Sequence, residues 1–563
     1  MENPGKAIST SGPKELEVFH LKTFRDSSER TKFNLLSVGV FSYLLVLFLC
    51  LRWNAIVSRS RFNPDEAELL ADGIRASKSF IPFKDFTSPT FGPIWPMFLG
   101  YLHRFGLPLS LPIAHLLSAL MLIGICKLVF NALIRRFSII LALIIVTPLS
   151  LQFATGLGDF DYLSLSTELL PLVFLVVATA ITYRQVLEHK EILYVGLFFG
   201  LAVFSKYFFA PLALIGMLMA LSKAQSDGLR WISSLKWMIL GFCLPMVLLV
   251  SVALLGGIPI WKILESPLMT FQYLQGGGLG NSACSGLDRL NNIRSSFSAH
   301  FSSFSLLLLA ISLCISSGIS IRSRHQAFRI VLILSPPVVA IFLLLSNCTI
   351  FPHYNFLLVG GVLQLFIAST SLTPRDKDSR PKSESRIVLS LYVFVIMQIL
   401  LTNVVPAVLT PLAKGTEKSP QFLSATNGLW ERAWDSERTP LSSFCARGDS
   451  VLVWGWSPEL YSFYGWEPAS RYVTTTSMID HEMFSHDVTT YRARLTGDLD
   501  LTSVNCVVVA IGPSFFGSFD ENDSMKVQMP DLWEKAASRL NEKTFYWDSV
   551  NPFTVLVPRQ TDD

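Results

Sequence analysis

Long apolar runs dominate the chain between residues 35 and 412. Each run is about 20 residues long, which is the length that crosses a bilayer as an α-helix. The runs do not alternate between polar and apolar residues, which excludes a bacterial β-barrel. We predict eleven transmembrane spans, at 34–53, 112–134, 138–156, 164–183, 191–205, 207–221, 236–256, 304–321, 329–346, 355–372 and 387–411.

The stretch 191–221 has two interpretations, because Lys206 interrupts its 31 apolar-rich residues. One straight helix of that length would be roughly 46 Å long and would exceed a hydrocarbon core of about 30 Å. A hairpin of two short helices places 11 Lys and Arg of the later loops on one side and 3 on the other, and a single crossing inverts this ratio. Basic loop residues favour the cytoplasm, so we predict the hairpin.

This topology divides the chain into three parts. We predict a cytoplasmic N-terminal segment at 1–33, a membrane module at 34–411 and an external soluble domain at 412–563. The module has a long first external loop at 57–111, and the protein is predicted to be a polytopic α-helical membrane protein with a C-terminal α/β domain.

The first external loop contains two segments that suit the membrane surface. Asn63 and Pro64 are typical of a helix N-cap and first helical position, and Gly73 is a plausible end for that helix. The second segment, Phe91–Phe105, is apolar and carries aromatic residues of the kind found at the headgroup level.

The composition of the last 150 or so residues is that of a soluble domain. Buried strands are predicted at 451–455, 506–512 and 553–558. Helical patterns separate them at 458–464, 481–496 and 530–542. The alternation of strands and helices predicts a small α/β domain with a parallel sheet.

Composition and charge narrow the class of protein. Hydrophobic residues make up 51% of the chain and charged residues only 16%, whereas soluble chains carry roughly 25% charged residues. Disorder, a coiled coil and a purely soluble enzyme are therefore excluded. The net charge of +4 is too small to suggest a nucleic-acid partner.

The eight cysteines show no CxxC and no zinc spacing, so they predict no metal framework. Cys445 precedes one predicted strand and Cys506 opens another. Neighbouring strands in an external compartment would allow these two to form a disulfide. Two buried free thiols are the alternative.

Several ionisable residues that are far apart in sequence fall at the outer ends of the predicted spans. Ionisable groups at membrane depth are energetically costly and are usually functional. Glu168 is a further candidate, because it lies in the start of an apolar span. The converging residues are Asp65, Glu66, Asp159, Asp161, Lys206 and His353.

Each candidate also has a structural interpretation. Asp65 and Glu66 suit the positive end of a helix, and Glu66 could complete a capping box. Asp159 and Asp161 lie in a turn, where Asp is common. Lys206 could extend its amine to the membrane surface, and the residues around His353 could form an interfacial aromatic belt.

Taken in order, these segments resemble the GT-C polyprenyl-phosphate-sugar glycosyltransferases, in particular the bacterial protein-O-mannosyltransferase-like and lipid A aminoarabinose-transferase-like members. The resemblance covers roughly residues 30–410. It rests on Asp65-Glu66 with 67–73, the proline segment Ser88–Pro93, the acidic turn with Asp159 and Asp161, Ser166-Thr167-Glu168, Ser205-Lys206 within 200–211, and Phe351-Pro352-His353-Tyr354.

The resemblance implies direct, inverting transfer of a hexosyl or pentosyl group from a polyprenyl-phosphate donor to an acceptor hydroxyl on a glycan, lipid or protein. It places the reaction at the outer face of the plasma (inner) membrane. By the same resemblance, Asp65 is the general base. The substrate-binding residues would be Glu66, Asp159, Asp161, Glu168, Lys206, His353, Tyr354 and Arg61, with Lys206, His353 and Arg61 near the lipid phosphate.

Some GT-C enzymes use a divalent cation and others do not, so a metal remains an open possibility for this sequence. The competing class is a secondary transporter, which the short hairpin at 191–221 would suit. Transporters usually show repeated halves and charges near the bilayer midplane, whereas here no halves repeat. A receptor or scaffold built around the C-terminal domain is a third interpretation.

Overall fold

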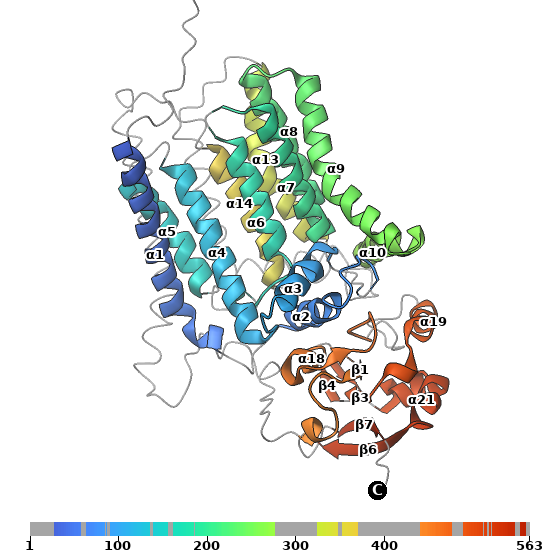
Figure 1. Cartoon of the computed structure of the whole chain (residues 1–563). Coiled ribbons are helices and arrows are strands. Elements are labelled where there is room, and N and C mark those ends of the chain that lie inside the picture. Colours follow the sequence, from blue (N-terminus) through green and yellow to red (C-terminus); the bar gives the residue numbers. More distant parts are fainter. Residues whose placement is uncertain are drawn as a thin grey trace, which may run out of the picture.

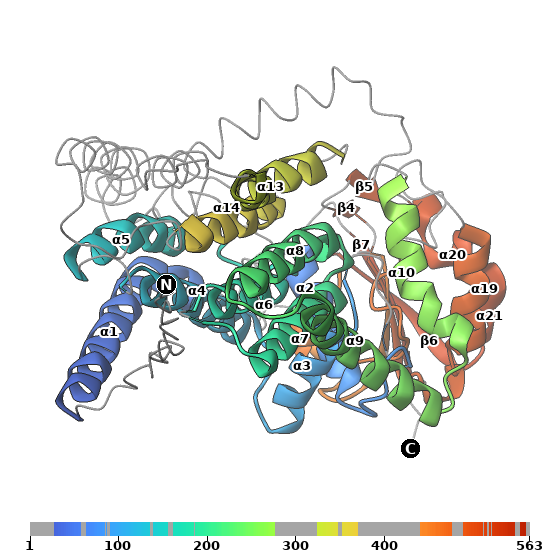
Figure 2. The same ribbon diagram turned by 90° about the horizontal axis from the view of Figure 1, so that it is seen from above.

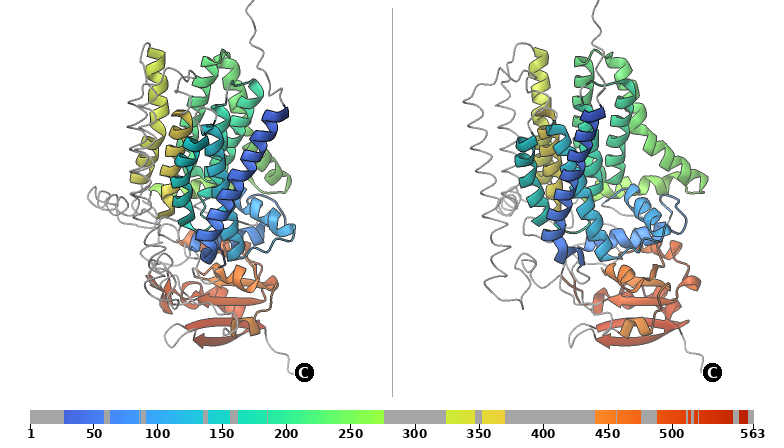
Figure 3. Two further views of the ribbon diagram at one scale, coloured as in Figure 1. Left: turned by 90° about the vertical axis from the view of Figure 1, so that its left-hand side faces the viewer. Right: turned by 60° about the vertical axis from the view of Figure 1, so that its left-hand side comes forward.

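The computed structural model has two parts, a bundle of long helices and a smaller domain built around a mixed sheet (Figure 1). The C-terminal domain lies at one end of the bundle in both views of Figure 3. The structure describes residues 27–57, 63–84, 86, 91–134, 139–155, 162–184, 186–275, 324–346, 352–369, 440–455, 457–475, 488–510, 512–514, 517–519, 521–546 and 552–558.

The bundle consists of apolar helices that run side by side (Figures 1 and 3). They are α1 (Ser27–Val57), α4 (Leu111–Leu133), α5 (Ile139–Thr155), α6 (Leu169–Thr182), α7 (His189–Ser205), α8 (Ala210–Ser226), α9 (Trp231–Leu255), α13 (Arg324–Ser346) and α14 (Asn355–Ser369). Every predicted span within the described residues overlaps one of these helices. The spans predicted at 304–321 and 387–411 lie outside the described residues.

Four helical stretches are long and apolar enough to cross a membrane by length and composition. They are Leu111–Leu133, Tyr207–Ser226, Trp231–Leu255 and Gln326–Leu345. The stretch in α9 is buried over only 22% of its apolar window, so its remaining apolar side chains are available to contact lipid. These observations confirm a helical membrane protein.

The stretch 191–221 is a hairpin, as the distribution of basic residues predicts. Helix α7 ends at Ser205, Lys206 is extended, and a short 3-10 helix, η3 (Tyr207–Phe209), leads into α8. At the far ends of the two helices, the Leu187 amide donates a hydrogen bond to the Asp227 carboxylate at 3.0 Å. The chain therefore returns to the membrane face from which it started.

Small residues bring α7 and α9 into close contact. A Cβ added at Gly196 would lie 2.2 Å from the carbonyl oxygen of Met238, and one at Gly241 would lie 2.1 Å from that of Leu193. Only glycine permits this backbone approach, which is typical of packing between membrane helices. The contact fixes the position of α7, and α7 carries Lys206 at its end.

The first external loop contains two short helices, α2 (Pro64–Ala76) and α3 (Ile94–Arg104). The Asn63 side chain caps α2, as predicted, by accepting a hydrogen bond from the Asp65 amide at 2.7 Å. The predicted end at Gly73 is wrong, because the helix continues for three more residues. Gly73 serves packing instead: a Cβ there would lie 2.7 Å from Cβ of Leu99 in α3.

The C-terminal domain contains a five-stranded sheet in the order β2-β1-β3-β7-β6. Its strands are β1 (Ser450–Trp454), β2 (Glu467–Pro468), β3 (Cys506–Ala510), β6 (Leu540–Tyr546) and β7 (Pro552–Pro558). A hairpin of β4 (Gly512–Ser514) and β5 (Gly517–Phe519) follows β3. The helical elements are η7 (Pro440–Ser443), α18 (Glu459–Tyr464), α19 (Val488–Asp498), η9 (Leu501–Ser503), η10 (Glu521–Asp523), α20 (Met525–Gln528) and α21 (Pro530–Ala537).

The predicted α/β class of this domain is confirmed, but the predicted all-parallel sheet is wrong. Strands β1, β2 and β3 are parallel, whereas β7 is antiparallel to both β3 and β6. The helix predicted at 530–542 ends at Ala537, and β6 follows it. The strand predicted at 506–512 ends at Ala510. Residues 481–487 of another predicted helix lie outside the described residues.

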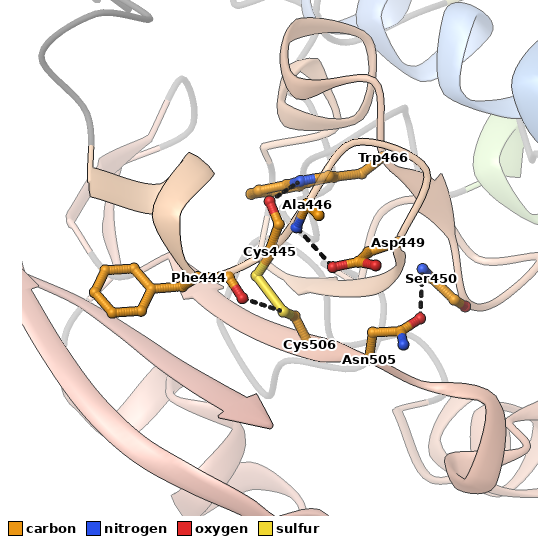
Figure 4. Close-up of a disulfide and its surroundings, with 8 residues drawn as sticks. All are labelled: Phe444, Cys445, Ala446, Asp449, Ser450, Trp466, Asn505 and Cys506. Atoms are coloured by element: carbon orange, nitrogen blue, oxygen red, sulfur yellow. Dashed lines mark hydrogen bonds between the residues drawn. A yellow bond between two sulfur atoms is a disulfide. The ribbon is translucent and has the colours of Figure 1, made fainter. Parts of the chain in front are cut away.

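A disulfide joins Cys445 to Cys506, which confirms the predicted pairing (Figure 4). The two Cα atoms are 6.1 Å apart, within the usual range for a disulfide. The bond ties the segment that enters the domain to the first residue of β3. The indole of Trp466 donates a hydrogen bond to the Cys445 carbonyl at 3.0 Å and packs beside this link (Figure 4).

Among the described residues, the C-terminal domain contacts the membrane module at α2 and just beyond it, and at α10 (Ile260–Gln275). Figure 2 shows α10 lying beside α19, across the direction of the bundle. Arg75 of α2 donates a hydrogen bond to the Pro468 carbonyl at 2.7 Å. On α10, Glu265 lies 2.8 Å from Arg494 and 3.3 Å from Arg471. The predicted boundary at 411–412 falls outside the described residues.

Candidate functional site

Asp65 and His353 form an ion pair between two distant segments. Asp65 is the second residue of α2, and its Oδ2 lies 3.3 Å from Nε2 of His353 in the 3-10 helix η4 (Pro352–Tyr354). The Asp65 side chain keeps 23% of its surface exposed, while His353 keeps 5%. The carboxylate is therefore held by the protein and still open on one side.

The environment of Asp65 keeps it ionised at neutral pH. Burial on its own would raise the pKa of Asp65, but the hydrogen bond and charge of His353, together with the charge of Lys206, lower it below its ordinary value. The positive end of α2 acts in the same direction. An ionised, partly open carboxylate can accept a proton from a hydroxyl placed beside it.

A second pair, Lys206 and Glu168, lies next to the first. Lys206 Nζ donates hydrogen bonds to the Glu168 carboxylate and to the Thr167 hydroxyl. Both side chains are buried, with 4% of Lys206 and none of Glu168 exposed. The break between α7 and α8 presents Lys206, and Glu168 precedes the first residue of α6.

Tyr354 connects the two pairs. Its ring centroid lies 5.5 Å from Lys206 Nζ, a cation–π distance. The same ring is perpendicular to the imidazole of His353, with the centroids 4.8 Å apart. The site therefore combines two carboxylates, a lysine, a histidine and an aromatic ring from four separate segments of the chain.

Glu66 points away from the Asp65 pair and into the protein. It is fully buried, accepts a hydrogen bond from the Leu165 amide at 2.7 Å and lies 3.0 Å from His115 Nε2. These contacts hold residues 162–168 against α4, and this segment carries Glu168. In the described structure Glu66 therefore helps to position the segment that carries Glu168.

Arg52, near the end of α1, supports the same segment. It donates hydrogen bonds to the Leu163 carbonyl at 2.6 Å, the Tyr162 carbonyl at 3.2 Å and the Ser118 hydroxyl at 3.3 Å. The sequence alone did not single out Arg52 or His115 as functional residues. A lone cation within an apolar span was the available indication, since membrane-depth charges are rarely incidental.

The described candidates come from distant segments of the chain and lie close together. These candidates are Asp65, Glu66, Glu168, Lys206, His353 and Tyr354. Arg61, Asp159 and Asp161 lie outside the described residues. Their roles stay predictions.

A divalent cation also stays a prediction. Within the described part of the chain, no three or more His, Cys, Asp or Glu side chains form a group that could hold a metal ion. The carboxylates of the site are engaged instead by the imidazole of His353, the amine of Lys206 and nearby hydroxyls.

No protein-family model and no curated protein sequence matches the chain. Among solved structures it is similar to ArnT from Cupriavidus metallidurans bound to undecaprenyl phosphate, with 13% identity, 93% of this chain and 98% of that chain covered, and a TM-score of 0.49. It is also similar to the archaeal oligosaccharyltransferase AglB from Archaeoglobus fulgidus, solved with an inhibitory peptide and a dolichol-phosphate. That match has 11% identity, 94% and 74% coverage and a TM-score of 0.42.

Proposed function

We propose that this protein is a GT-C glycosyltransferase that moves one sugar from a polyprenyl-phosphate donor to an acceptor hydroxyl. The observation that carries the proposal is the Asp65–His353 pair beside Lys206, where a partly exposed carboxylate lies next to two groups suited to a phosphate. The clustering of these groups at the ends of apolar helices supports a lipid-linked substrate.

The proposed step is a single displacement at the anomeric carbon. Asp65 takes the proton of the acceptor hydroxyl, and the oxygen of that hydroxyl bonds to the anomeric carbon of the sugar. The bond between the anomeric carbon and the phosphate oxygen breaks with inversion. The lipid phosphate leaves with the electron pair and an added negative charge. Lys206 and His353 would stabilise that charge, because fixed cations in a site shielded from water act most strongly on a developing anion.

The remaining predicted residues have supporting roles in this proposal. Tyr354 orients the two cationic side chains, and Glu66 holds the segment that carries Glu168. Arg61, Asp159 and Asp161 would contact the donor or acceptor. We further propose that the site and the C-terminal domain face the periplasmic or extracellular side, where a glycan, lipid or protein acceptor would be reached.

A secondary transporter is the alternative function, favoured by the helix break at Lys206. Transport would require the charged groups to serve a path through the whole bundle. The described charges of this site instead gather at one end, where Asp65 keeps an open face. A transporter would also leave the chemical bonds of a lipid-linked sugar intact.

The test compares Asp65→Asn with a matched control, Asp531→Asn. Asp531 follows the proline that begins α21, as Asp65 follows the one that begins α2, but it lies in the C-terminal domain and is exposed. Purified protein in nanodiscs would be given a labelled polyprenyl-phosphate sugar and a membrane extract as acceptor. We expect Asp65→Asn to lower the transfer rate by about 10²–10⁴-fold and Asp531→Asn to leave it unchanged. Near-normal transfer by Asp65→Asn would reject Asp65 as the base.

A further inference from the structure

Lys206 already has a full set of partners within the protein. Its amine is bonded to the carboxylate of Glu168 and the hydroxyl of Thr167, and the ring of Tyr354 covers it. Only 4% of the lysine side chain is exposed. A phosphate that binds Lys206 must therefore compete with an anion that already occupies it.

The charges in the site make this competition strong. The carboxylates of Asp65 and Glu168 face the amine of Lys206 and the imidazole of His353, so the cluster carries no excess positive charge whether or not His353 is protonated. A phosphate approaching this cluster would gain little attraction while Lys206 stays bonded to Glu168. The attraction becomes large only when the lysine leaves its carboxylate, because a buried charge interacts strongly with whichever anion it contacts.

Glu168 has hydrogen bonds that hold its carboxylate in place when Lys206 leaves. Its second carboxylate oxygen accepts hydrogen bonds from the hydroxyls of Ser166 at 2.5 Å and Thr167 at 3.0 Å. The segment itself is fixed from outside, since the indole of Trp95 donates to the Thr167 carbonyl at 2.8 Å. Lys206, by contrast, has a flexible four-carbon side chain at a helix break.

We propose that Glu168 is a latch that competes with the lipid phosphate for Lys206. The proposal rests on the proposed function, because it takes Lys206 as a phosphate contact. In the resting site Lys206 is held by Glu168, and it transfers to the phosphate when the donor binds. After sugar transfer the phosphate carries an additional negative charge and attracts Lys206 more strongly. Competition from Glu168 for Lys206 weakens that hold and so allows the polyprenyl phosphate to leave. Glu168 is thus a positioning residue that acts through Lys206.

The latch predicts that removing the charge of Glu168 strengthens phosphate binding. We would measure the affinity of undecaprenyl phosphate for the full-length protein in phosphatidylcholine nanodiscs. A coupling free energy of the usual size predicts that Glu168→Gln binds this lipid about 5- to 150-fold more tightly than the unmodified protein. A merely structural role predicts weaker or unchanged binding, since the variant would only loosen the site.

A matched control exists at the other end of the bundle. Lys223 and Asp227 form a second, largely buried lysine–carboxylate pair far from the site. Asp227→Asn disturbs a buried lysine in the same way and should leave the affinity for undecaprenyl phosphate unchanged. A tighter affinity in this control as well would overturn the latch, because the effect would then not be specific to Glu168.

A second variant has the opposite expected sign and keeps the charge of the site. Ser166→Ala removes one hydroxyl that would satisfy Glu168 without Lys206, so Glu168 should hold the lysine more firmly and undecaprenyl phosphate should bind more weakly. If Glu168→Gln does not fold, this variant decides. Tighter or unchanged binding by Ser166→Ala would overturn the latch.

Lys206→Gln separates the latch from the proposed function. If Lys206→Gln loses affinity while Glu168→Gln binds no more tightly than the unmodified protein, the phosphate site stands and the latch is wrong. If Lys206→Gln binds undecaprenyl phosphate as well as the unmodified protein does, Lys206 is not a phosphate contact. Both the proposed phosphate-binding role of Lys206 and the latch are then wrong.

Discussion

Replacing Asp72 with asparagine should stabilise the folded protein, and the gain should grow as the pH rises. Asp72 lies on α2, which packs against α18 of the C-terminal domain. It is fully buried, and neither carboxylate oxygen has a hydrogen-bond partner among the described residues. Burial, and then the neighbouring charge of Glu68, raises the pKa of Asp72 well above its ordinary value of 3.8.

The sign of this pH dependence follows from the number of protons that Asp72 binds in the folded and in the unfolded chain. Below pH 3.8 the side chain is protonated in both the folded and the unfolded chain, so the carboxyl adds no pH-dependent penalty. Above that pH the unfolded chain loses the proton while the folded chain retains it. Folding stability then falls by about 1.4 kcal/mol per pH unit until the folded pKa is reached. An asparagine has no such dependence, although its buried amide still lacks partners.

The size of the effect follows from the cost of a buried group without partners. Leaving a buried polar group unsatisfied costs about 1–3 kcal/mol, and more for a charged one. We therefore expect the unfolding free energy of Asp72→Asn to exceed that of the unmodified protein by at least about 1–3 kcal/mol at pH 8. Near pH 4 the two unfolding free energies should match. The assay is denaturant unfolding of the purified protein across this range, with Asp531→Asn as the exposed control. A stability difference that does not change with pH would refute the reasoning.

Two further predictions concern Asp65, the proposed base, and the contact between the C-terminal domain and the membrane module. His353→Gln removes the imidazole that lowers the pKa of Asp65. The pH at which sugar transfer is lost on acidification should therefore rise in this variant. A pH–rate profile checks this, and an acidic limb at the same pH as in the unmodified protein would contradict it. Glu265→Gln removes the negative charge with which α10 of the membrane module binds Arg471 and Arg494 of the C-terminal domain. Breaking such a buried pair should lower the unfolding free energy by about 3–5 kcal/mol, measured by denaturant unfolding.

The exposed pair of Lys526 and Glu542 is the control for the domain contact. Their side chains are 62% and 43% exposed, and the atoms are 3.8 Å apart. An exposed pair of this kind contributes about 0–1 kcal/mol. Lys526→Gln should therefore leave the unfolding free energy nearly unchanged. An equal loss in both variants would show that the Glu265 contact has no special role.

The helical part of the fold was predictable because its physical causes are local. Apolar runs locate the spans, and the unequal distribution of basic residues selects the hairpin around Lys206, which in turn places Lys206 and His353 at one end of the bundle. The alternatives for Asp65 and Glu66 could not be separated in this way. Adjacent residues of a helix point about 100° apart, and only the packing of α2 decides that Asp65 faces His353 while Glu66 faces Leu165.

The features that the sequence did not reveal depend on contacts between distant segments. Strand β6 follows α21 within a few residues, and its antiparallel partner β7 determines its structure. Strand preference depends strongly on such partners, so a local pattern extends the helix too far. The pairing of Lys206 with Glu168 is also nonlocal: each residue looked like an isolated charge at the end of a span.

The most direct test of the central claim is a structure of the protein with bound undecaprenyl phosphate, obtained by electron cryo-microscopy in nanodiscs. The account predicts that the phosphate lies about 3 Å from Lys206 Nζ and beside His353, with Asp65 facing the open side of the phosphate where a sugar would be attached. A phosphate bound away from both residues, with the Asp65–His353 pair enclosed and out of reach of any substrate, would contradict the account.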